Sequence, residues 1–128
     1  MKEGPENVLK TWMTGINNNE LECVVNLYSE NAILIPTFSN RVLNTPGKIR
    51  LYFENLTNRE DLSVALHEKT LDIQSIDTNL YAMSGIYCWR FAVDGEILSF
   101  EARFTFLVDL KCPKPILHHH SSQIPRTL

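Results

Sequence analysis

The chain has 128 residues, a formal net charge of −3 at pH 7, 44% hydrophobic residues and 21% charged residues. The length is typical of one domain, residues 1–128, and the composition excludes a disordered chain and a charged coiled coil. The acidic balance excludes the dense basic surface that nucleic acid requires, and no apolar run is long enough to span a membrane. We therefore expect a compact soluble domain with neither a nucleic-acid nor a membrane partner.

The first part of the chain has the apolar spacing of helices. Pro5 suits the first position of a helix, and apolar residues recur at helical spacing over residues 8–16. Asn19 followed by Glu22 resembles a capping pair. This pair predicts a second helix, whose buried face extends to Tyr28.

A short strand and a third helix follow. The apolar run of residues 32–35 ends at Pro36, which is typical of a buried strand. Thr45 is a good N-cap, and Pro46 suits the first helical position after it. The apolar stripe of this predicted helix consists of Ile49, Tyr52, Phe53 and Leu56.

From residue 62 onward the apolar period changes to two, which predicts strands. Residues 62–66 alternate, whereas residues 71–73 are out of phase with them, so we expect a bulge or bend near residues 68–69. Residues 79–93 form a long predicted strand. Its shared face consists of Tyr81, Met83, Gly85, Tyr87, Trp89, Phe91 and Val93.

The remaining strands complete an antiparallel sheet. Asp94-Gly95 predicts a tight hairpin into residues 97–109, the segment 112–115 ends that strand, and residues 116–122 form the last one. Helices followed by such strands predict an α+β fold, in which about three N-terminal helices pack in a strongly bent sheet. A curved sheet closed by helices would leave an internal pocket on its concave side.

Three consecutive histidines lie on the last predicted strand. His118 and His120 share one face of a strand, and His119 lies on the other. The simplest interpretation places hydrogen-bonded histidines at a pocket wall or a subunit interface. The alternatives are acid–base catalysis and a metal site completed by His67 or a carboxylate.

A second group of candidates lies on the strand before it. Glu101, Arg103 and Thr105 share the face opposite the phenylalanines. This face is either solvated or lines the cavity, where the guanidinium of Arg103 would hold a carboxylate and Trp89 would form a wall.

The polar segment after the first strand is a further candidate. Turn chemistry explains the segment Thr37–Arg41, and the alternative is that Asn40 and Arg41 lie at the mouth of the cavity.

The cysteines and glycines show no cofactor motif. Cys23, Cys88 and Cys112 form no C-x-x-C pair, and the scattered glycines form no phosphate-binding loop. We therefore predict a cytoplasmic protein with no cofactor and no metal.

Several segments resemble one protein family. The strings Tyr52–Leu56 and His118–Pro125 resemble parts of the association (hub) domain of calcium/calmodulin-dependent protein kinase type II. The resemblance is closer to the stand-alone bacterial relatives of that domain, which Ile35–Arg41 also resembles. It extends from about Pro5 to Pro125.

The resemblance implies a nuclear transport factor 2-like fold, a cone of helices in a bent sheet with a pocket at its open end. It further implies a homodimer or higher homo-oligomer through the sheet, and a pocket that accepts small carboxylates, with Arg103 and Tyr52 as matching residues. Ile35 and Ser121 replace an acidic residue and an arginine of the kinase form, so the ligand preference is not implied. The chain has no kinase domain, and kinase activity is not implied either.

Three functions follow from these observations. The first is a self-associating domain with a pocket for a small anionic or carboxylate-bearing ligand. The second is an isomerase, dehydratase or cyclase that uses His118, His120, Tyr52 or Glu101 as acid or base. The third is an adaptor for a protein partner. The pocket candidates are Arg103, Tyr52, Glu101, Trp89, His118, His120, Asn40 and Arg41.

Overall fold

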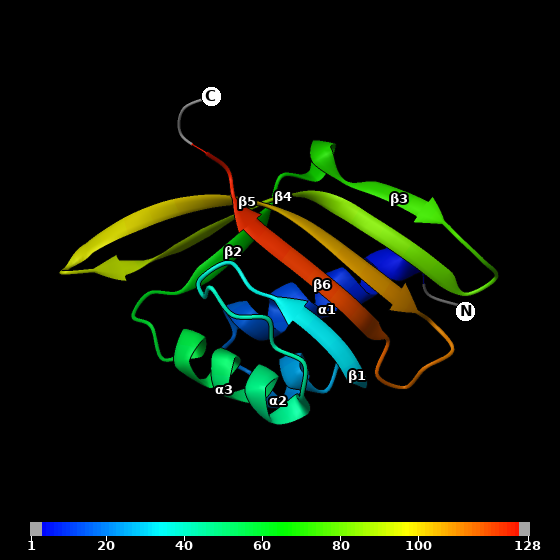
Figure 1. The fold of residues 1–128 in the computed structure, drawn as a ribbon. Helices are drawn as coiled ribbons and strands as arrows, with labels where there is room; N and C mark the ends of the chain where they lie inside the picture. Colours follow the sequence, from blue (N-terminus) through cyan, green and yellow to red (C-terminus); the bar gives the residue numbers. More distant parts are fainter. Residues whose placement is uncertain (1–3, 126–128) are drawn as a thin grey trace.

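The structure is a computed structural model that describes residues 4–125. In this part of the chain three α-helices pack on one face of a curved six-stranded sheet (Figure 1), which confirms the α+β prediction. The helices are α1 (Pro5–Asn17), α2 (Leu21–Val25) and α3 (Pro46–Thr57). The strands are β1 (Tyr28–Ile35), β2 (Ser63–Leu66), β3 (Asp72–Ser75), β4 (Leu80–Val93), β5 (Glu96–Asp109) and β6 (Ile116–Gln123).

The sheet is built around the β4–β5 hairpin. The strand order is β1-β6-β5-β4-β2, β3 also pairs with β4, and only β1 and β6 pair in parallel. Asp94 (φ 52°) and Gly95 (φ 83°) form the predicted two-residue turn, because both adopt the left-handed backbone that this hairpin requires. The predicted bend between β2 and β3 is a short 3-10 turn, η1 (Glu68–Thr70).

The end of α1 differs from the expectation. Asn19 has a φ of 57°, and the amides of Asn19 and Glu20 donate to the carbonyls of Ile16 and Gly15. This Schellman pattern makes Asn19 the residue that ends α1, so the prediction that it caps the next helix is wrong. The helix α2 is correspondingly short, and Tyr28 belongs to β1 instead of the predicted helix.

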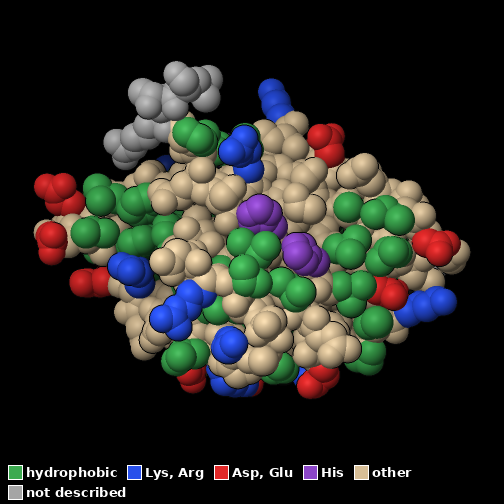
Figure 2. Space-filling model, in the orientation of Figure 1, with side chains coloured by type: hydrophobic (Ala, Val, Ile, Leu, Met, Phe, Trp, Pro, Cys, Tyr) green, Lys and Arg blue, Asp and Glu red, His purple; other side chains and the backbone are tan. Residues whose placement is uncertain are grey.

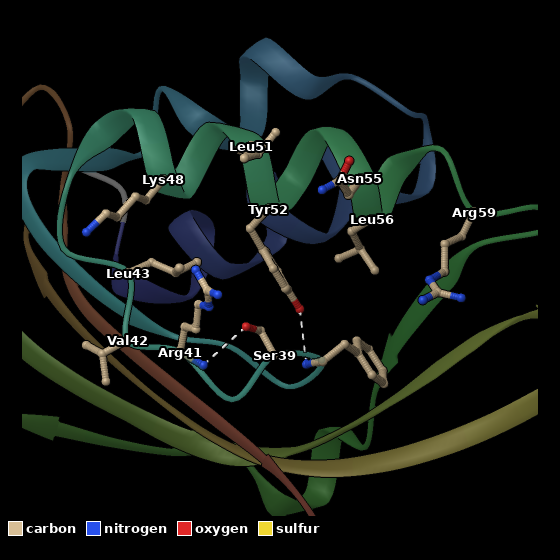
Figure 3. A pocket seen from close by; sticks show the side chains of 11 residues that line it. Ser39, Arg41, Val42, Leu43, Lys48, Leu51, Tyr52, Asn55, Leu56 and Arg59 are labelled. Carbon is tan, nitrogen blue, oxygen red and sulfur yellow. Dashed lines mark hydrogen bonds between the residues drawn. The ribbon is translucent and has the colours of Figure 1, made fainter.

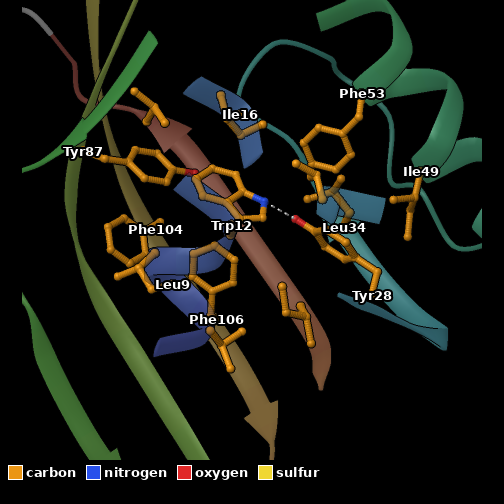
Figure 4. Close-up of a cluster of buried hydrophobic side chains, with 14 of the residues drawn as sticks. Leu9, Trp12, Ile16, Tyr28, Leu34, Ile49, Phe53, Tyr87, Phe104 and Phe106 are labelled. Atoms are coloured by element: carbon orange, nitrogen blue, oxygen red, sulfur yellow. Dashed lines mark hydrogen bonds between the residues drawn. The ribbon is translucent and has the colours of Figure 1, made fainter. Parts of the chain in front are cut away.

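The space between helices and sheet is filled by aromatic side chains (Figure 4). Trp12 of α1 lies at the centre, stacked on Tyr87 with ring centroids 5.6 Å apart and edge-on to Phe106 at 5.4 Å. The helices therefore cover the face of the sheet that carries the phenylalanines. A cavity of about 10 Å³ lies within this core, lined by residues that include Trp12, Trp89 and His119. The concave side is thus mostly solid core.

None of the helices in residues 4–125 has the length and apolarity needed to cross a bilayer.

Candidate functional site

A cavity of about 400 Å³ lies between α3 and the loop that follows β1 (Figure 3). Pro36 ends β1, the chain turns back so that Leu43 pairs with Leu34, and Pro46 then starts α3. The loop is thereby held over the helix. The cavity is lined by Phe38, Ser39, Arg41, Val42, Leu43, Lys48, Leu51, Tyr52, Asn55, Leu56 and Arg59. Its volume lies within the range of small-molecule sites.

The charge of this pocket is positive. Arg41, Lys48 and Arg59 line it, and none of its eleven lining residues carries a carboxylate. The Nζ of Lys48 donates to the side chain of Asn44 at 3.3 Å, and the guanidinium of Arg59 lies 4.6 Å from the ring centroid of Phe91. These contacts hold the side chains of Lys48 and Arg59 in position, and neither contact involves a negative charge. The pocket therefore favours an anionic group.

Tyr52 places a phenol in the pocket. Its oxygen accepts a hydrogen bond from the backbone amide of Phe38 at 3.3 Å (Figure 3). Burial raises the pKa of Tyr52 to about 12, so the phenol is protonated at neutral pH. A protonated phenol that accepts from Phe38 can still donate its own proton to a ligand.

A hydrogen-bonded chain crosses the core beneath this pocket. Trp12 Nε1 donates to the hydroxyl of Tyr28 at 3.0 Å, and this hydroxyl lies 2.7 Å from His119 Nδ1. On the other side of the ring, His119 Nε2 lies 3.1 Å from the hydroxyl of Tyr87. An indole nitrogen can only donate, so the Tyr28 oxygen accepts from Trp12, and in the neutral His119 ring one nitrogen donates while the other accepts.

His119 is held in the neutral form. Burial lowers its pKa well below the usual value, and the neighbouring His118 and His120 lower it further. The interior of the fold thus contains a neutral imidazole whose two nitrogens face the hydroxyls of Tyr28 and Tyr87.

The other histidine and strand candidates lie on the outer sheet face, by which we mean the face turned away from the helices. His118 is half-buried and His120 exposed on β6, and Figure 2 shows histidine side chains in the middle of this face. Arg103 and Glu101 are exposed on β5, and the carboxylate of Glu101 lies 2.6 Å from His67 Nε2. Arg103, which the resemblance implies as a pocket residue, therefore does not line the cavity in this structure.

Of the predicted site residues, the structure brings Tyr52 and Arg41 together in the pocket. Asn40 is exposed in the same loop without lining the cavity, and Trp89 is core, edge-on to Phe38 at 5.7 Å.

Sequence reasoning missed two cations of the pocket, Lys48 and Arg59. A partial signal was present, since Lys48, Tyr52 and Asn55 recur at the spacing of one helix face, whereas Arg59 lies beyond the end of α3. Among residues 4–125 no three histidine, cysteine or carboxylate side chains gather as a metal ligand set.

This architecture, helices packed in a bent and unclosed sheet, is that of the nuclear transport factor 2-like proteins. The sequence profile of the calcium/calmodulin dependent protein kinase II association domain matches residues 4–125. The chain belongs to this family. Among curated proteins, none matches the sequence significantly.

Solved structures agree with this assignment of the fold. A Xanthomonas campestris protein named for the same association domain superposes with a TM-score of 0.85 at 23% identity, over 98% of this chain and 95% of that one. A Streptomyces avermitilis protein of the NTF2-like family, named as a dehydratase, gives 0.79 at 11% identity over 94% of each chain. A ketosteroid isomerase-like protein from Erwinia carotovora atroseptica gives 0.74 at 10% identity, over 94% and 93%.

Proposed function

We propose that this protein is a self-associating domain whose pocket under α3 binds a small anionic ligand, most simply a carboxylate. The observation that carries the ligand proposal is that Arg41, Lys48 and Arg59 all line one cavity and that none of its lining residues is a carboxylate. The phenol of Tyr52 adds a hydrogen-bond donor. A planar guanidinium and a nearby phenol suit the two oxygens of a carboxylate.

The test is a calorimetric titration of the full chain with benzoate and with neutral benzamide. We expect benzoate to bind and benzamide to bind much more weakly, because only benzoate carries the charge that the three cations select. Arg41→Gln should weaken benzoate binding about tenfold, the cost of one charge-assisted contact. Arg90→Gln removes a cation on the outer sheet face and serves as the control. Equal binding of both compounds would contradict the proposal.

Proton transfer is the less favoured function of this site. Of the four acid–base candidates, only Tyr52 lines the pocket, whereas His118, His120 and Glu101 lie on the outer sheet face. A pKa of about 12 for Tyr52 is far from the neutral range in which a general acid or base works best. This difference supports a binding role over an isomerase, dehydratase or cyclase activity.

For self-association we propose the outer sheet face as the interface. Membership of the association-domain family supports assembly. The face also carries exposed apolar surface, since Ile33 of β1 lies beside His118 of β6 and is 37% exposed. Light scattering at micromolar concentration should show a dimer or a larger assembly. A monomer throughout this concentration range would refute the assembly part and leave the ligand part standing.

A further inference from the structure

The pocket under α3 has an apolar side as well as a basic one. Leu43 and Leu56 are buried, and Phe38 is half-buried, on its inner wall. Val42 and Leu51 stand at its opening and are 55% and 57% exposed. A pocket built only to hold a small polar anion would not need apolar side chains facing solvent at its mouth.

The exposed pair at the opening is not scattered surface. Within residues 4–125, the large apolar side chains that are more than half exposed are Val42, Leu51, Ile76 and Ile97. Two of these four border the same cavity, and they come from opposite walls, Val42 from the loop and Leu51 from α3 (Figure 3). Exposed apolar surface concentrated at a concave site is typical of a binding surface, whereas isolated exposed residues need no explanation.

The cations are placed beside this apolar opening. Figure 3 shows Arg41 and Lys48 on the same side of Tyr52 as Val42, with Arg59 at the far end. An anionic head held by Arg41 would leave the body of a ligand next to Val42 and Leu51. A bare anion would leave the apolar residues exposed to water. A neutral apolar molecule would strip water from the cations without offering them a negative charge, which is unfavourable. A ligand with both parts satisfies both surfaces.

We propose that the ligand of this pocket is an amphipathic acid, in which a carboxylate is joined to an unbranched alkyl body of several carbons. The head contacts Arg41 and Lys48, and the body covers Val42 and Leu51. This inference rests on the proposed function and narrows its ligand class from any small carboxylate to one with an alkyl body. A small polar carboxylate has no such body, so we expect it to bind as weakly as acetate.

The test is a calorimetric series on the full chain with acetate, butyrate and hexanoate, and with neutral hexanamide. We expect the affinity to rise about fourfold for each added methylene, the ratio that corresponds to burying one methylene group. Hexanamide should bind much more weakly than hexanoate. Equal affinity for acetate and hexanoate would overturn the amphipathic ligand but leave anion binding intact. Hexanamide binding as tightly as hexanoate, or no binding of any acid, would overturn the proposed function as well.

Two variants locate the apolar contact. Val42→Ser and Leu51→Ser should reduce the ratio of hexanoate to acetate affinity towards one. Ile97→Ser, at an equally exposed apolar position in the β4–β5 hairpin and outside the pocket lining, is the matched control and should keep the wild-type ratio. If Val42→Ser and Leu51→Ser both keep the full chain-length dependence, the inference is overturned.

Discussion

His119 is an imidazole enclosed by aromatic rings, with only 2% of its surface exposed. Its ring stacks on Phe106 at a centroid distance of 3.8 Å, and both of its nitrogens meet tyrosine hydroxyls. A neutral imidazole fits this environment because its two nitrogens supply one acceptor and one donor. A protonated ring would carry two donors and an unpaired charge in the core, which is costly. The residue therefore links the stability of the fold to pH.

We expect the free energy of unfolding to fall as the pH is lowered below about 6.5, the ordinary pKa of histidine. Burial lowers the pKa of native His119, so below that pH the unfolded chain binds a proton that the native protein excludes. The loss approaches about 1.4 kcal/mol per pH unit and ends once the pH reaches the lowered native pKa. Urea unfolding between about pH 7.5 and about pH 5 measures this slope.

His119→Gln is the comparison, since an amide also offers a donor and an acceptor but does not titrate. It should be less stable than the wild type at neutral pH and should show a shallower loss on acidification. Nitrogen NMR of wild-type His119 provides a second readout, in which one ring nitrogen stays protonated and the other unprotonated in mildly acidic buffer. A doubly protonated ring under those conditions would refute the assignment.

The inward or outward direction of single side chains was only partly predictable. Alternation along β5 correctly placed Glu101, Arg103 and Thr105 on one face and the phenylalanines on the other. It did not say which face the helices cover. The phenylalanines decide this, because burying them against Trp12 removes more apolar surface from water than burying the polar set would. Arg103 therefore lies outside, and the pocket takes its cations from the loop before α3 (Arg41), from α3 (Lys48) and from the segment after it (Arg59).

At the scale of elements, the local signals that act through the backbone were predictive. Thr45 and Pro46 start α3, and Asp94-Gly95 forms the hairpin turn. Asn19 was misassigned because asparagine favours both a helix N-cap and the left-handed end of a helix. The choice between these two roles depends on the residue at which α1 ends, because the last carbonyls of α1 accept the hydrogen bonds from Asn19 and Glu20.

The N-cap of α3 matters for the pocket as well as for the helix. The hydroxyl of Thr45 accepts a hydrogen bond from the amide of Lys48 at 3.2 Å, and Lys48 is itself a pocket residue. Thr45→Ala should lower the free energy of unfolding by about 1 kcal/mol, because one amide of the first turn loses its acceptor. Thr45→Ser keeps the acceptor and should stay within a few tenths of the wild type. Urea unfolding of the three proteins measures these free energies. Equal losses of unfolding free energy for the alanine and serine variants would show that the cap hydrogen bond contributes nothing.

At the scale of the whole molecule, the two proposed activities use opposite sides of the sheet. The pocket lies between α3 and the loop after β1, on the helix side, whereas the proposed interface is the outer sheet face. The aromatic core around Trp12 separates them. Since no pocket residue lies in the proposed interface, assembly and ligand binding should be separable by substitution.

Thr105→Glu provides that separation. Thr105 is exposed on the outer sheet face and pairs with His120 on β6 and Ser84 on β4, so a carboxylate there would lose its hydration when a second copy covers this face. Light scattering should show the variant shifted to monomer, while calorimetry shows hexanoate binding as in the wild type. Thr11→Glu on the exposed side of α1 is the matched control and should keep the wild-type mass. An unchanged mass for Thr105→Glu would place the assembly contact on another surface, and a loss of hexanoate binding would show that the two sides are coupled.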